Sequence, residues 1–335
     1  MDIADIGIKV LSAADMGMRG MGRTDLRDAV RGGRLVVVHR GWYVDATTWR
    51  GWYPESRHVA KALAVVRTMR GGEVLLSHAS AAALWGLPFY RFDPPRVHVS
   101  GAGTNGVTRG SSGVARHEVA VEGHHAEVDG VPVTSLARTA ADLAGRLPLE
   151  AAISIVDAAL RKVAWVDGSR RYDIDAAEEW KAKVLGCSAL RRGARGSVQG
   201  RWVVEFADGR AQLPGESVSR LYLHQLGFAP PRLQVRIDHS TGWYDIDFGL
   251  DDVQVWGEFD GTGKYTDPEM LAERSTAEAV LEEKRREDDI RGRTRRPIIR
   301  WGSPHIRDVD AFRQRLADFH VRPPAGPGGV SRSFS

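Results

Sequence analysis

Two neighbouring segments, residues 244–248 and 253–260, constrain the fold of this chain more than any other feature. In both, apolar residues alternate with polar or acidic ones, and the intervening residues supply turn chemistry. A period of two predicts half-buried strands, so we expect a hairpin. Side chains on one face of a strand recur every second residue, which predicts that Asp247 shares a face with Glu258 and Asp260. These carboxylates would repel one another, and a hard cation such as Mg²⁺ would relieve the repulsion.

The same residues carry a family resemblance. An Asp before an apolar residue, a hairpin, a Glu-apolar-Asp-Gly run and a nearby basic residue resemble the PD-(D/E)xK nuclease core, and more narrowly the very-short-patch-repair-like endonuclease domains. The resemblance covers roughly the last third of the chain. It implies that Asp247 and Glu258 are metal ligands, and that Glu216 lies on the helix before a mixed sheet flanked by helices. The broad family has Lys two residues after the Glu, but this chain has Asp260 there, and Lys264 lies four residues further on.

Arginines gather after this hairpin without an intervening acid, at positions 291, 293, 295, 296, 300 and 307. Arginine suits phosphate because its planar fork offers paired hydrogen bonds. Beside an acidic hairpin, this charge layout suits a site that cuts phosphodiesters. We therefore expect Arg293, Arg295 and Arg296 to contact DNA.

The N-terminal segment predicts a small DNA reader. Apolar periodicity suggests helices before residue 20, and Thr24 can cap a further helix that ends at Gly32-Gly33. On that helix Arg23, Arg27 and Arg31 recur every four residues and form one basic stripe. Strands at 35–38 and 42–44 follow, around a turn that contains Arg40. This order predicts a winged helix-turn-helix, with the stripe in the major groove and Arg40 over phosphate. An arginine-rich solvated helix face is the alternative.

The front half also resembles a family as a whole. The Leu-Ser-His-Ala-Ser run at 76–80 and the Gly-Val-Pro-Val-Thr-Ser-Leu-Ala-Arg-Thr run at 130–139 resemble the AbiEi-type antitoxins of type IV toxin–antitoxin systems. In that family a winged domain binds operator DNA and a second domain contributes to regulation. The resemblance implies DNA and a cognate toxin as partners. It leaves the oligomeric state open, with a dimer on DNA as one option.

Together these patterns predict a mixed α/β, multidomain protein. We expect a winged helix-turn-helix at 1–52, an AbiEi-like α/β domain at 53–162 and a basic connector of low regularity at 163–212. An endonuclease-like domain at 213–322 and a disordered Pro-, Gly- and Ser-rich tail at 323–335 follow. In the middle domain His78, His117, His124 and His125 lack a thiolate partner and a regular pair spacing. This favours scattered surface or capping histidines over a zinc site.

The N-terminal sequence, the lengths of the apolar runs and the cysteine content indicate the cellular compartment. The N-terminus lacks the basic start and apolar run of a signal peptide, and no run approaches the roughly 18 apolar residues of a membrane span. The single cysteine, Cys187, permits no intrachain disulfide. These features predict a cytoplasmic protein with no membrane partner.

The sequence is compatible with three functions. In the first, a DNA-binding antitoxin-like protein carries a Mg²⁺-dependent endonuclease in which Asp247, Glu258 and Glu216 hold the ion. Lys264 would then position the attacking water, and Asp260 would join the ligands or pair with Arg286. In the second, the nuclease fold has lost its chemistry, and the protein is a transcriptional autoregulator. The displaced lysine favours the second function. A protein-interaction module is a third, blander alternative.

Overall fold

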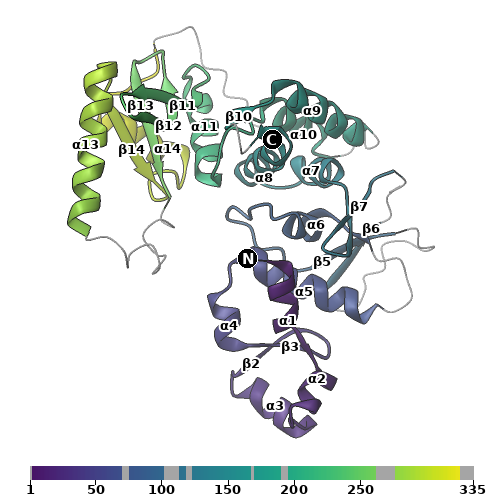
Figure 1. Cartoon of the computed structure of the whole chain (residues 1–335). Helices are drawn as coiled ribbons and strands as arrows, with labels where there is room; N and C mark the ends of the chain where they lie inside the picture. The colour runs from purple at the N-terminus through teal and green to yellow at the C-terminus, as the bar shows by residue number, and fades with distance from the viewer. Residues whose placement is uncertain are drawn as a thin grey trace. The chain divides into compact units, whose positions relative to one another are not determined.

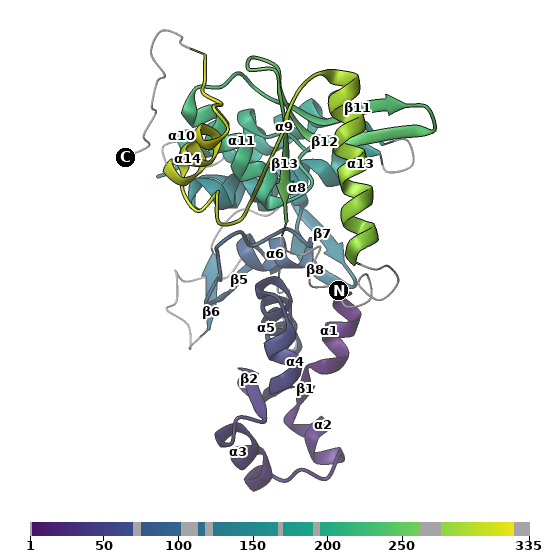
Figure 2. The same ribbon diagram turned by 90° about the vertical axis from the view of Figure 1, so that its left-hand side faces the viewer.

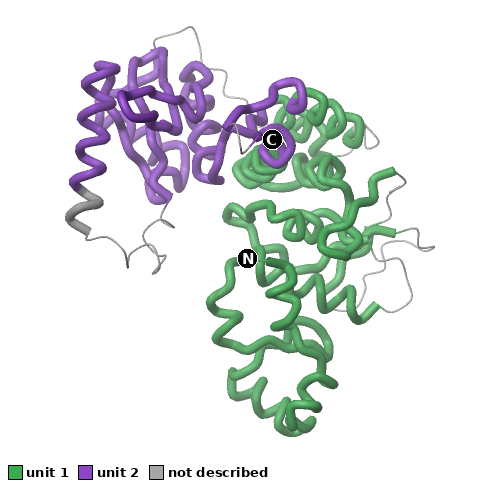
Figure 3. The backbone as a smooth tube through the Cα atoms, viewed as in Figure 1, with its two compact units in different colours: residues 1–159, 178–205 green, residues 160–177, 206–335 purple. Residues whose placement is uncertain are grey.

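The structure is a computed structural model that describes residues 2–69, 75–101, 113–117, 123–166, 170–189, 195–261 and 276–324, with the side chains of 276–280 left out. It is a mixed α/β protein with several sheets, as predicted (Figure 1). The chain divides into two compact units (Figure 3). Unit 1 comprises residues 1–159 and 178–205, and unit 2 comprises residues 160–177 and 206–335. None of the described helices has the length and apolar character needed to cross a membrane.

Unit 1 begins with six elements that end in a β-hairpin. They are α1 (Ile3–Lys9), β1 (Leu11–Ser12), α2 (Ala13–Met18), α3 (Arg23–Arg31), β2 (Leu35–His39) and β3 (Trp42–Asp45). Strands β1, β3 and β2 form a sheet in that order, and β1 is a strand that the sequence did not predict. A capping box begins α2, because Ser12 and Asp15 exchange side-chain and backbone hydrogen bonds. In Figures 1 and 2, α3 lies at the end of unit 1 away from the five-stranded sheet.

The rest of unit 1 is built on a five-stranded sheet with the order β6-β5-β4-β8-β7. Its strands are β4 (Leu75–Leu76), β5 (Val97–Ser100), β6 (Val114–His117), β7 (His125–Val128) and β8 (Val131–Thr134). The helices are α4 (Ala46–Gly51), α5 (Pro54–Thr68), α6 (His78–Leu84), α7 (Leu136–Ala144), α8 (Leu149–Ala164), α9 (Ile174–Ala189) and α10 (Ser197–Phe206). Alanines are fully buried along α5, α6 and α8, so these helices approach their neighbours closely.

The prediction of low regularity across 163–212 is wrong. Helices α9 and α10 occupy much of this range. In α9 the side chains of Ala177, Trp180, Val184 and Cys187 are buried, and their spacing follows one helix face. Basic residues between these apolar positions made the apolar face of the helix hard to recognise in the sequence. The boundary between the two units falls inside α8 and again inside α9.

Unit 2 contains a four-stranded mixed sheet with the order β11-β12-β13-β14. Its strands are β11 (Arg232–His239), β12 (Gly242–Leu250), β13 (Val255–Asp260) and β14 (Ile298–Gly302), and its helices are α11 (Pro214–Leu226), α13 (Thr276–Thr294) and α14 (Val309–Asp318). A short hairpin, β9 (Trp165–Val166) with β10 (Arg171–Tyr172), precedes them. The predicted hairpin is confirmed as β12 and β13, which are antiparallel, and β14 pairs parallel with β13.

Helices cover both faces of the unit 2 sheet. Ile290 of α13 is buried in a cluster with Val235, Ile246 and Trp256. On the other face, Trp301 of β14 packs on Phe312 of α14 and donates a hydrogen bond from its indole N–H to Ser219 of α11. The predicted arrangement of a mixed sheet flanked by helices is therefore present, with Glu216 on the helix before the sheet.

Candidate functional site

The first candidate surface is α3 with the β2–β3 turn. Arg23, Arg27 and Arg31 are all exposed, whereas Leu26 and Ala29 of the same helix are buried. The predicted stripe therefore lies on the solvent side of the helix. The helix begins at Arg23 with Gly22 as its N-cap, two residues before the predicted cap at Thr24, because the Asp25 carboxylate accepts a hydrogen bond from the Gly22 N–H at 2.9 Å.

The turn between β2 and β3 presents one more cation. Arg40 is exposed beside Gly41, whose φ of 80° is a left-handed conformation that glycine adopts without strain. The pairing of β2 with β3 shifts register between Val37 and His39, which bends the hairpin just before this turn. The predicted hairpin is thus present with Arg40 at its turn, as predicted. Helix α3 packs against strand β2 of this hairpin.

The second candidate region joins Glu216 of α11 to Asp247 of β12. The Gln234 side-chain amide donates to Glu216 Oε2 at 3.1 Å and to Asp247 Oδ1 at 3.2 Å. Glu216 also accepts from the Gln212 N–H at 2.9 Å. Burial, and after it the charge of Asp247, raises the pKa of Glu216 to about 8. Two carboxyl groups therefore lie close together here, and one of them holds its proton at neutral pH.

Glu258 has different partners. Its carboxylate accepts from Arg286 of α13 at 2.5 Å and from Arg300 of β14 at 3.1 Å. The Arg286 guanidinium also binds Glu283 and the Asp245 carbonyl. Arg286 thus pairs with Glu258 and Glu283. The predicted alternative, a pair between Arg286 and Asp260, is wrong.

The strand alternation explains why Asp247 and Glu258 differ. Ile246 faces α13, but Phe248, two residues later, packs against Trp301 on the opposite face. The period of two is broken at Asp247, opposite Gln234, whose φ is 50°. Asp247 Oδ2 instead accepts from the Phe259 N–H at 2.8 Å, beside the last ladder pair, Phe248 with Gly257.

The three predicted carboxylate ligands do not surround one point in this structure. Within the described part of the chain, one group of three or more His, Cys, Asp or Glu has all its ligand atoms within 4.8 Å of one another, and it is not formed by Glu216, Asp247 and Glu258. The expected sharing of one face fails because the face changes at Asp247. Asp260 is exposed at the end of β13, and Lys264 lies outside the described residues.

The predicted arginine surface of unit 2 is partly neutralised. Arg293 pairs with Asp289 at 2.9 Å, and Arg296 pairs with Asp251 at 2.5 Å. Arg295 is exposed just past the end of α13. An ion pair with a carboxylate competes with phosphate for the same guanidinium hydrogen bonds, so these residues form a weaker anion surface than the sequence alone indicated.

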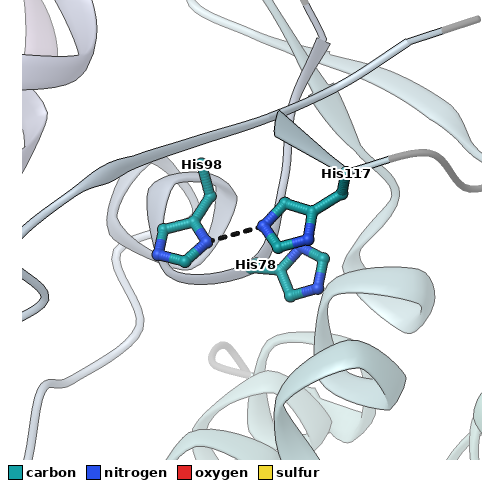
Figure 4. Close-up of side chains that lie close together, drawn as sticks. All are labelled: His78, His98 and His117. Atoms are coloured by element: carbon teal, nitrogen blue, oxygen red, sulfur yellow. Dashed lines mark hydrogen bonds between the residues drawn. The ribbon is translucent and has the colours of Figure 1, made fainter. Parts of the chain in front are cut away.

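The metal-ligating side chains that do lie close together in the described residues are His78, His98 and His117 of unit 1. His78 begins α6, and His98 and His117 lie on the adjacent parallel strands β5 and β6. Figure 4 shows the three rings side by side. The ring centroids of His78 and His117 are 3.8 Å apart with planes at 21°, and those of His98 and His117 are 5.1 Å apart with planes at 9°. A hydrogen bond of 2.9 Å joins His98 Nδ1 to His117 Nε2.

The expectation of scattered histidines is wrong for His78 and His117. His78 is buried, and both residues belong to the cluster. His98, the third member, was not among the histidines considered. The strand pattern around residues 97–100 could have indicated it, because alternation places the His98 and Ser100 side chains on the same face. The parallel pairing with β6, which brings in His117, is not visible in the sequence.

Comparison with known proteins gives relatives but no function. No protein-family model matches the chain. The chain is 28% identical over 264 residues to an uncharacterized protein of Mycobacterium tuberculosis, found in strains CDC 1551 and H37Rv. The similarity covers 78% of this chain and 87% of that protein.

Proposed function

We propose that this protein binds double-stranded DNA through α3 and the β2–β3 turn and acts as a transcriptional regulator of the antitoxin type. The observation that supports this most directly is the exposed row of Arg23, Arg27 and Arg31, next to a hairpin tipped by exposed Arg40. A helix inserted into the major groove with a wing beside it needs cations at these places. The resemblance of the front half to the AbiEi-type antitoxins supports operator DNA as the ligand and a cognate toxin as a further partner.

The charges on α3 remain available to phosphate. Arg31 pairs with Asp28 at 3.6 Å, and both side chains are more than half exposed. Exposed pairs of this kind contribute about 0–1 kcal/mol, so phosphate can displace the carboxylate at little cost. Arg296 of unit 2, in contrast, is held by Asp251 at 2.5 Å and its own side chain is only 19% exposed. The α3 surface is therefore the stronger candidate for the DNA contact.

Fluorescence anisotropy with a labelled duplex tests this proposal. The duplex from upstream of the gene is compared with a random duplex of equal length between about 50 and 200 mM salt. We expect the Arg27→Ala variant to bind about 3- to 10-fold more weakly and to show a salt slope shallower by about 0.9, since one phosphate contact is lost. Arg96→Ala, an exposed arginine beside β5, is the matched control. Binding that is insensitive to salt, or unchanged in Arg27→Ala, contradicts the proposal.

A second function is favoured by the Glu216–Asp247 pair. Glu216 keeps its proton first because it is buried and second because the Asp247 carboxylate lies beside it, and a hard cation would relieve both effects. Oxygen donors suit Mg²⁺, so Glu216 and Asp247 fit part of the predicted ligand set. Glu258 does not join them unless it leaves Arg286 and Arg300. In a Mg²⁺-dependent DNA endonuclease the ion would supply an activated water and charge stabilisation.

Plasmid nicking separates the two functions. Supercoiled plasmid is incubated with the full chain and Mg²⁺, and the Asp247→Asn and Glu258→Gln variants are compared with Asp260→Asn. An endonuclease predicts metal-dependent nicking that both of the first two substitutions abolish. Undiminished nicking in either variant removes these residues from the mechanism. Salt-sensitive DNA binding without nicking supports the regulator alone.

A further inference from the structure

We propose that His78, His98 and His117 form a binding site for a divalent transition-metal ion, with zinc as the best match. The site lies where the start of α6 meets β5 and the edge strand β6. It is independent of the DNA-binding and nuclease proposals, because none of its residues belongs to α3, the β2–β3 turn or unit 2.

The spacing of the three rings is close to what a shared ion requires. One ligand nitrogen from each ring lies within 4.8 Å of the other two. Zinc binds imidazole nitrogen at about 2.0–2.1 Å in tetrahedral sites, which places two ligand nitrogens roughly 3.3 Å apart. The His98 Nδ1 to His117 Nε2 separation of 2.9 Å would open slightly. The nearly parallel rings would rotate about their side-chain bonds to aim their nitrogens at one point.

Neighbouring groups hold one of the rings in a suitable orientation. The Nδ1 atom of His78 lies 3.1 Å from the Ser77 hydroxyl and 4.0 Å from Asp142 Oδ2. Asp142 is buried and is held in turn by Arg138 at 3.1 Å. Histidine ligands of metals commonly donate their other ring N–H to such a carboxylate or hydroxyl, which fixes the tautomer. We assign Nε2 as the ligating nitrogen of His78 on this basis.

A backbone hydrogen bond and the partial exposure of two rings also support a metal site at this cluster. The His98 N–H donates to the Ser80 hydroxyl at 2.8 Å, which ties β5 to α6 beside the cluster. His98 and His117 are half-buried, so the ring edges can be reached from solvent.

The three imidazole ligands narrow the choice of metal. Three imidazoles suit zinc, nickel, copper and iron, whereas Mg²⁺ and Ca²⁺ prefer oxygen ligands. Three protein ligands leave one tetrahedral position for water or another small ligand.

Cobalt binding to the full chain tests the site. The protein is prepared without a polyhistidine tag, stripped with a chelator and titrated with Co²⁺, whose visible absorption reports coordination, followed by displacement with Zn²⁺. We expect one ion per chain. The His98→Gln and His117→Gln variants should each bind at least about 100-fold more weakly, since even the loss of an outer-shell partner costs 10- to 100-fold. Mg²⁺ in large excess should not compete.

His125→Gln is the matched control, because His125 is an exposed histidine on β7 of the same sheet. It should bind cobalt like the unmodified protein. Circular dichroism melting shows whether each variant is folded, and the half-buried His117 at the sheet edge is the substitution expected to perturb folding least. Failure of the unmodified protein to bind cobalt or zinc overturns the proposal, as does unchanged affinity in folded His98→Gln and His117→Gln.

Discussion

Each unit buries a titratable side chain in its neutral form, His58 in unit 1 and Glu216 in unit 2, and these two side chains respond to pH in opposite directions. In unit 1, burial and the charge of Lys61 lower the pKa of His58 to about 3. In unit 2, burial and the charge of Asp247 raise the pKa of Glu216 to about 8. The leading cause, removal from water, is the same in both units. The difference arises because the protonated form is charged in histidine and neutral in glutamate.

The signs for stability follow from proton linkage. Between pH 6.5 and about 3, the unfolded chain binds a proton at His58 that the folded chain does not, so acid destabilises unit 1. Between pH 4.5 and about 8, the folded chain keeps a proton at Glu216 that the unfolded chain has released, so rising pH destabilises unit 2. Acid and alkali therefore weaken different parts of one molecule.

The largest effect on stability is expected for the Glu216→Gln variant. The amide keeps the size of the side chain and its oxygen can accept from Gln212 and Gln234, but it cannot ionise. We expect unit 2 of the variant to be more stable than the unmodified protein at pH 8 by a few kcal/mol, since one pKa unit corresponds to about 1.4 kcal/mol, with little difference at pH 4.5. Hydrogen exchange of peptides from β12 and β13, compared at equal pH, measures this.

Asp260→Asn is the control for that experiment, because Asp260 is an exposed carboxylate on the same strand as the β13 peptides. It should leave the pH response of unit 2 unchanged. Equal protection of β12 and β13 in Glu216→Gln and the unmodified protein at pH 8 would mean that Glu216 is already ionised in the folded state.

The next largest effect is expected for His58→Gln. His58 is fully buried, its Nε2 lies 2.8 Å from the Ser80 hydroxyl, and its ring packs edge-on against Phe89. Loss of that packing should destabilise unit 1 by about 1–2 kcal/mol at pH 7. The decline in stability from pH 6.5 to 4 should also become shallower, because the proton-binding ring is gone. Hydrogen exchange of α5 and α6 peptides at pH 5 and 7 provides the measurement, with His125→Gln as control. A decline as steep as that of the unmodified protein assigns the acid response to another group.

The smallest effect is expected for Asp28→Asn. Its carboxylate pairs with Arg31 at the surface, so the change should alter the stability of unit 1 by less than about 0.5 kcal/mol at every pH. Removal of a negative charge beside the α3 arginines should strengthen DNA binding slightly, as anisotropy would show. A marked destabilisation would mean that exposed charges, as well as buried ones, set the pH behaviour of this unit.

Much of the fold could be predicted from periodicity. The hairpin of β12 and β13, the helix carrying Glu216 and the N-terminal helices with their hairpin all follow local patterns, because strands and helices bury apolar residues at fixed intervals along one face. Gly227 ends α11 with a φ of 90°, as a glycine after a helix predicts. Helices α9 and α10 were missed because charged residues obscured the apolar stripe of α9.

The candidate sites were harder to predict because they depend on contacts between distant residues. Asp247 and Glu258 would share a face if β12 were regular, but the positive φ of Gln234 marks a change of face that no local sequence pattern signals. His78, His98 and His117 are brought together by the start of α6 and by parallel strand pairing. Side-chain identity alone could not show that pairing, since the strands that carry His98 and His117 are not contiguous in the sequence.

The boundary between the units lies within continuous helices, and this limits how the chain can be dissected. A cut after residue 159 severs α8, and a cut after residue 177 severs α9. Each excised piece would carry a helical stump without the residues that complete it. Fragment studies of DNA binding or metal binding should therefore keep α8 through α10 whole, and the individual contributions of the units are better separated by point substitutions than by truncation.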